Sequence, residues 1–69
     1  MNTIEITING KKNSIAADAT LLSLMKEMKI SPEKTVAMIN DIVVKPSEYA
    51  AAILKNADKI ELMSFVGGG

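Results

Sequence analysis

One segment of this 69-residue chain has the periodicity of an amphipathic helix, and no other feature constrains the fold as strongly. Its apolar side chains recur at positions i, i+3, i+4 and i+7, which places them on one face of a helix: Leu21, Leu24, Met25 and Met28. A single helix with one apolar face needs one sheet to cover that face. The pattern therefore predicts a helix packed on a sheet.

The limits of this helix are predicted at about residues 20–29. Asp18 and Thr20 both precede the first apolar residue, and either side chain can cap the free N–H groups of the first turn. Ser31-Pro32 follows the last apolar residue, and proline disfavours α geometry in the residue before it. We therefore expect the helix to end at this dipeptide.

Strand signals occupy the segments on both sides of the helix. Residues 3–8 alternate polar and apolar, which predicts a half-buried strand with its isoleucines towards the core. Asn9-Gly10 then predicts a tight turn into a second strand over residues 11–17, because both residues tolerate positive φ. After the helix, the chain predicts a series of short elements: strands at 35–39 and 42–44, a single turn at 46–49, a segment at 50–54 that covers one end of the core, a turn at 56–58 and a strand at 59–66.

The order strand, strand, helix, strand, strand, strand predicts an α+β domain of the β-grasp, or ubiquitin-like, type. We expect a mixed sheet of about four to five strands packed on one main helix. Residues 1–66 form this domain in our prediction, and residues 67–69 form a flexible C-terminal glycine tail.

The composition argues against several kinds of function. The chain has no cysteine and no histidine, so it lacks the soft metal ligands and the residues for a Ser-His or Cys-His nucleophile. We expect no metal site and no catalytic residue. A formal net charge of zero predicts no recruitment of nucleic acid, and the sequence lacks an apolar run of membrane-spanning length. A cytoplasmic carrier or binding module, rather than an enzyme, is the expectation.

The glycines at 67–69 are the strongest candidate for chemistry. A chain without Cβ atoms is thin enough to thread a narrow channel and bring a terminal carboxylate to a buried reaction centre. Gly67 and Gly68 are the predicted threading residues. By themselves the three glycines favour a frayed end; the β-grasp order in front of them favours a reactive terminus, because the last strand directs them off the sheet.

Side chains just before the glycines predict a docking patch. Met63 and Phe65 alternate with the core-facing residues of the last strand, on a sheet face that a one-helix fold leaves without cover. We predict that Met63, Phe65 and Val66 bind a partner. The alternative is that residues 50–54 fold over part of this face.

The sequence resembles the ThiS family, the sulfur carriers of thiamine biosynthesis. The matching segments run almost from end to end: Asn9-Gly10, the Leu-rich helix from Thr20, residues 36–40, residues 43–49, residues 56–62 and Phe65-Val66-Gly67-Gly68-Gly69. There are two departures. The family motif is a Gly-Gly terminus where this chain has three glycines, and the family often has Asp-Gly-Asp where this chain has Asn56-Ala57-Asp58.

The resemblance implies a pathway for the glycine carboxylate. A ThiF-like adenylating enzyme of the ubiquitin-activating type uses ATP to adenylate it, and a cysteine desulfurase relay supplies the sulfur. A ThiG-like thiazole synthase then takes the sulfur from the resulting thiocarboxylate. The reactive residue is Gly69, or Gly68 if the chain is trimmed. No cofactor bound by this chain is implied.

Other functions remain open from the sequence. The same chemistry serves sulfur transfer to molybdopterin, cysteine or another product, and a ubiquitin-like modifier would use the same glycine to form an isopeptide bond. A non-covalent β-grasp interaction module is the alternative of a different class. Residues appended after Gly69 would abolish a carrier and leave such a module intact.

Overall fold

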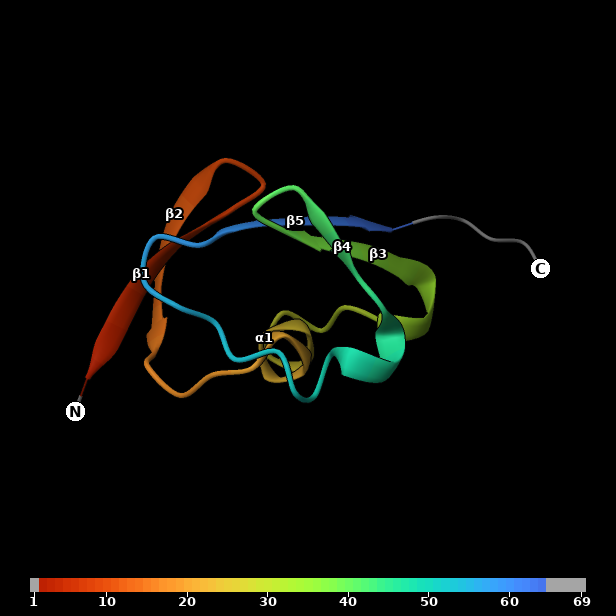
Figure 1. The fold of residues 1–69 in the computed structure, drawn as a ribbon, viewed down its shortest axis with the longest axis horizontal. Helices are drawn as coiled ribbons and strands as arrows, with labels where there is room; N and C mark the ends of the chain where they lie inside the picture. Colours follow the sequence, from red (N-terminus) through yellow and green to blue (C-terminus); the bar gives the residue numbers. More distant parts are fainter. Residues whose placement is uncertain (1, 65–69) are drawn as a thin grey trace.

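The computed structural model describes residues 2–64 and contains a five-stranded sheet and one α-helix (Figure 1). The elements follow one another in the predicted order: β1 (Thr3–Ile8), β2 (Lys11–Ala16), α1 (Leu21–Glu27), the 3₁₀ turn η1 (Pro32–Lys34), β3 (Thr35–Ile39), β4 (Ile42–Val44), the 3₁₀ turn η2 (Pro46–Glu48) and β5 (Lys59–Ser64).

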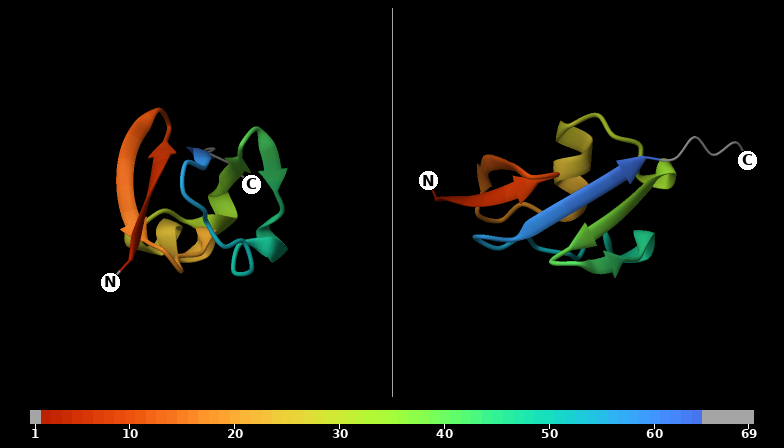
Figure 2. Two further views of the ribbon diagram at one scale, coloured as in Figure 1. Left: turned by 60° about the vertical axis from the view of Figure 1, so that its left-hand side comes forward. Right: turned by 90° about the horizontal axis from the view of Figure 1, so that it is seen from above.

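The sheet is mixed, with the strand order β2-β1-β5-β3-β4. The last strand, β5, runs parallel to β1 and antiparallel to β3, and therefore lies at the centre. The two hairpins β1–β2 and β3–β4 flank it. Helix α1 packs on one face of this sheet, as Figures 1 and 2 show. The predicted β-grasp architecture is confirmed.

Two hairpin turns share one type of backbone conformation, which the sequence predicted for Asn9-Gly10. Asn9 and Gly10 have φ values of 50° and 86°, and Asn40 and Asp41 have φ values of 52° and 70°. Positive φ at both central residues is the requirement of the two-residue turn that matches the twist of the flanking strands. These turns determine the register of both hairpins.

Helix α1 begins with a reciprocal cap made by Thr20. The Thr20 hydroxyl accepts a hydrogen bond from the Ser23 N–H at 3.1 Å, and the Ser23 hydroxyl accepts one from the Thr20 N–H at 3.0 Å. Two backbone donors at the helix start are satisfied in this way. Of the two predicted capping residues, Thr20 is therefore the one in use.

The C-terminal end of the helix differs from the prediction. The helix ends at Glu27, and Lys29 adopts a left-handed φ of 59°. The Ile30 N–H donates to the Met25 carbonyl at 2.9 Å, and the Lys29 N–H donates to the Lys26 carbonyl at 3.0 Å. These two bonds form a Schellman motif, which ends the helix well before Pro32.

Two predictions about this region are therefore wrong. Met28 is not buried: it is the C-cap residue of the helix and is 43% exposed, and the chain turns at Lys29 directly after it. Ile30 packs against the core instead. Pro32 does not end the helix; it starts the 3₁₀ turn η1.

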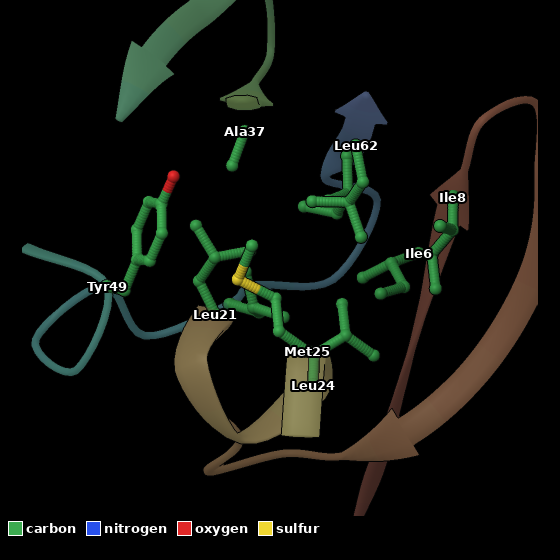
Figure 3. Close-up of a cluster of buried hydrophobic side chains, with 10 residues drawn as sticks. Ile6, Ile8, Leu21, Leu24, Met25, Ala37, Tyr49 and Leu62 are labelled. Atoms are coloured by element: carbon green, nitrogen blue, oxygen red, sulfur yellow. The ribbon is translucent and has the colours of Figure 1, made fainter. Parts of the chain in front are cut away.

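The core fills the space between α1 and the sheet (Figure 3). It takes side chains from the helix, from three central strands and from the segment after β4: Ile6, Ile8, Leu21, Leu24, Met25, Ala37, Tyr49, Leu54, Ile60 and Leu62. Tyr49 is a core residue that the sequence reading did not identify. Its hydroxyl donates to the Thr35 carbonyl at 3.1 Å, which satisfies the polar end of a buried ring.

The chain between η2 and β5 runs along the helix rather than across the sheet. The Leu21 N–H donates to the Ala52 carbonyl at 2.8 Å, and the Leu54 N–H donates to the Ala19 carbonyl at 2.9 Å. Leu54 is buried, so this segment does cover part of the core, as predicted. Ile53, between the two anchor points, is 60% exposed.

Candidate functional site

The sheet face away from α1 carries exposed apolar side chains. Side chains alternate between the two faces of a strand, and on β5 Ile60 and Leu62 are buried against the helix. Met63 therefore points to the opposite face, where it is 59% exposed. This is the orientation predicted from the sequence.

The neighbouring strands extend this surface. Val36 of β3 lies directly opposite Met63, and Met38 of β3 lies directly opposite Val43 of β4. Side chains opposite one another on adjacent strands are close enough to touch. Val36 and Val43 are 37% and 61% exposed, and Met38 is half-buried. We call these four residues, Val36, Met38, Val43 and Met63, the outer patch.

The outer patch is not covered by the segment that the sequence offered as an alternative cover. Residues 50–54 hydrogen-bond to the start of α1 and lie on the helix side of the sheet. In Figure 1 the helix and this segment lie below the sheet, and the opposite face of the sheet has no described segment over it. The alternative prediction is wrong, and the patch is open among residues 2–64.

Charged groups border the outer patch. Glu61 of β5 lies opposite Met38 and is half-buried. The Lys59 ammonium lies 3.1 Å from the Asp41 carboxylate. The hydrogen bond to Asp41 raises the pKa of Lys59, and the charges of Asp41 and Glu61 act in the same direction. An apolar centre beside charged groups is the usual composition of a protein-binding surface.

Met63 is the only one of the predicted partner-binding residues that lies within the described residues 2–64. Phe65 and Val66 lie outside the described residues, as do Gly67, Gly68 and Gly69. The proposed division between residues 66 and 67 also falls there, so it stays a prediction. Within residues 2–64, the structure contains no cluster of acidic side chains that would hold a metal ion and no helix long and apolar enough to cross a membrane.

Sequence reasoning missed the other members of the patch. Residues 35–39 and 42–44 read as continuous apolar runs, in which alternation alone does not say which side chains face outwards. The pairing of Ala37 with Leu62 determines which side chains of β3 face outwards. Both residues are buried, so Val36 and Met38, on either side of Ala37, must face the other way. Only the register between strands shows that Val36, Met38 and Val43 face outwards.

Comparison with known proteins adds a family to this geometry. The chain matches the ThiS family over residues 2–69. A thiazole synthase of Magnetococcus marinus is 35% identical over 66 residues, which are 96% of this chain and 20% of that protein. The chain therefore spans about a fifth of the length of this relative, and the same holds for a thiazole synthase of Paramagnetospirillum magneticum, which is 30% identical over 66 residues.

Two solved structures are similar in fold. The crystal structure of the thiamine biosynthesis protein ThiS from Geobacter metallireducens superposes with a TM-score of 0.82 at 26% identity, covering 96% of this chain and all of that one. A designed protein based on human erythrocytic ubiquitin has a TM-score of 0.56 at 26% identity, covering 100% of this chain and 98% of that one.

Proposed function

This chain belongs to the ThiS family, and we propose on that basis that it is a sulfur carrier of thiamine biosynthesis whose glycine carboxylate is the reactive group. The observation that carries the proposal is the family match, which extends through the glycines at 67–69. In the sequence, two residues separate the end of the central strand β5 from those glycines, and the outer patch includes Met63 of β5 and residues of the neighbouring strands. In this proposal the patch binds the partner and the glycines enter its reaction centre.

The proposed chemistry needs two steps at one carbonyl carbon. The carboxylate of Gly69 attacks the α-phosphate of ATP, which forms an acyl-adenylate and releases pyrophosphate. A sulfur nucleophile then attacks the carbonyl carbon, and AMP leaves. If the nucleophile is a persulfide, a thiol reductant must cleave the resulting acyl disulfide to leave the thiocarboxylate. The chain has no cysteine or histidine, so partner enzymes supply the sulfur and the catalytic groups in this scheme.

Three partners follow from this chemistry. A ThiF-like enzyme would adenylate the carboxylate, and a cysteine desulfurase relay would supply the sulfur. A ThiG-like thiazole synthase would accept it. The last partner has separate support, because two relatives that contain a region similar to this chain are named thiazole synthases. The chain itself is then a co-substrate rather than an enzyme.

The direct test is the intact mass of the protein. The chain of residues 1–69 is incubated with ATP, the ThiF-like enzyme, a cysteine desulfurase, cysteine and a thiol reductant. We expect a mass gain equal to the exchange of one oxygen for one sulfur, located in the C-terminal peptide. A chain extended by two residues after Gly69 is the control and should gain nothing. An unchanged mass of the unextended chain, in a mixture that sulfurates another ThiS-family carrier, would contradict the proposal.

A second prediction concerns the outer patch. Met63→Asp places a charge in the middle of the apolar surface and should weaken binding to the ThiF-like enzyme roughly tenfold or more. The thermal unfolding midpoint should change little, because the Met63 side chain is 59% exposed. Titration calorimetry and a thermal melt measure the two effects.

Ile53→Asp is the matched control for this prediction. Ile53 is also an exposed apolar residue, 60% exposed, but it lies beside the start of α1 on the other side of the sheet. We expect its affinity for the ThiF-like enzyme to equal that of the unmodified chain. Equal losses in the two variants would show that the outer patch is not the docking surface.

A further inference from the structure

The parallel pairing between β1 and β5 stops before β5 ends. The last paired residues are Ile8 and Ile60, and the Asn9 N–H then donates to the Ile60 carbonyl at 2.9 Å. At Asn9 the chain turns away with a φ of 50° and enters the hairpin to β2. In Figure 2, the right-hand view shows β5 continuing beyond the end of β1.

The side chain of Asn9 continues the ladder after its backbone has turned away. Its Oδ1 accepts a hydrogen bond from the Leu62 N–H at 2.9 Å, and its Nδ2 donates to the Leu62 carbonyl at 3.2 Å. A primary amide has the same donor and acceptor as a peptide group, so it can replace one residue of a neighbouring strand. Asn9 therefore hydrogen-bonds to both the N–H and the carbonyl of Leu62, which lies 53 positions further along the chain.

Asn40 makes a related contact at the opposite end of β5. Its N–H donates to the Lys59 carbonyl at 2.8 Å, and its Oδ1 accepts from the Lys59 N–H at 3.0 Å. Like Asn9, it is the first residue of a hairpin turn and has a positive φ, here 52°. Asn40 thus bonds the first residue of β5, and Asn9 bonds the fourth of its six residues, nearer the end that precedes the glycines in the sequence.

We propose that Asn9 is a positioning residue for the glycine tail. Beyond Ile60, the antiparallel partner β3 bonds one edge of β5, and the Asn9 amide bonds the other edge at Leu62. Because hydrogen bonds hold β5 on both edges at Leu62, the direction of the strand is fixed as it approaches Ser64, the last described residue. In this proposal, the direction of β5 at Ser64 determines where the chain leaves the docked domain on its way to the ATP site. The inference rests on the proposed carrier function.

The experiment compares Asn9→Gly with Asn40→Gly. Glycine keeps the positive φ of each turn and removes the amide, so both variants lose side-chain hydrogen bonds to β5 and keep their hairpins. Pyrophosphate release by the ThiF-like enzyme is measured against carrier concentration. For Asn9→Gly we expect kcat to fall about 10–100-fold, because misplacing a reacting group by about 1 Å costs that much. We expect KM to stay within twofold, since the outer patch is intact. Asn40→Gly should keep both constants.

An independent readout shows whether the strand end has been released. The Leu62 N–H has Asn9 Oδ1 as its acceptor, so its hydrogen exchange should accelerate in Asn9→Gly and stay unchanged in Asn40→Gly. Asn9→Asp retains that acceptor and loses the donor, and its kcat should lie between those of Asn9→Gly and the unmodified chain. Equal kcat values for the two glycine variants, or a loss that appears only in KM, would overturn the positioning role. Absence of pyrophosphate release with the unmodified chain would instead refute the proposed function.

Discussion

Gly68→Trp should reduce pyrophosphate release by the ThiF-like enzyme to the background rate while the domain stays folded. In our proposal, residues 67–69 enter a channel that admits a chain without side chains, and tryptophan adds both a Cβ and a large ring at the second-last position. The carboxylate of Gly69 would then fail to reach the α-phosphate. A C-terminal amide should give the same loss for a chemical reason, because an amide lacks the oxygen nucleophile that forms the acyl-adenylate.

The control for this prediction is an equally bulky change far from the glycines. Lys12 lies on the edge strand β2, with an exposed side chain, so Lys12→Trp should release pyrophosphate at the normal rate. Circular dichroism should show the same fold for all three proteins. Normal release by both Gly68→Trp and the amidated chain would leave a non-covalent binding module as the better interpretation.

Leu24→Ala should remove a large part of the stability of this domain. The side chain is 3% exposed and lies in the core between α1 and the sheet. Truncating a fully buried leucine typically costs about 2–5 kcal/mol, since apolar contacts are lost and a cavity remains. Natural domains are stable by only about 5–15 kcal/mol, and a chain of 69 residues is expected near the lower end. Urea denaturation followed by circular dichroism gives the change directly.

Met28→Ala is the matched control on the predicted helical face. The sequence pattern treats Met28 and Leu24 as equivalent, whereas the structure places Met28 at the exposed C-cap. We expect this variant to change the free energy of unfolding by less than about 0.5 kcal/mol, as is usual for surface positions. A large loss from Met28→Ala, or a negligible one from Leu24→Ala, would contradict the observed end of the helix.

Most of the secondary structure was predictable from the sequence because its signals are local. The alternation in residues 3–8, the Asn9-Gly10 turn and the apolar run at 35–39 each determine the conformation of their own segment. The helix was placed correctly at its start, where Thr20 and Ser23 are three residues apart. Its end was misplaced, because a left-handed lysine at position 29 has no strong sequence signal, unlike the glycine usually found there.

The candidate site was predictable only in part. Met63 was placed on the open face from alternation within one strand, and the comparison with the ThiS family supports the role proposed for the glycines. Val36, Met38 and Val43 join the patch through pairing between strands, which alternation within a single run does not reveal. Phe65 and Val66 stay predictions.

The sequence by itself determined the strands, the turns, the start of the helix and its buried face as far as Met25, because each depends on residues within a few positions of one another. Tertiary structure alone decided that β5 lies between β1 and β3, and that the amide of Asn9 therefore reaches Leu62, 53 residues away. Strand order and register follow from burying all the apolar faces at once. No single segment contains that information, because a strand has two edges and its partners are chosen only when the whole core packs.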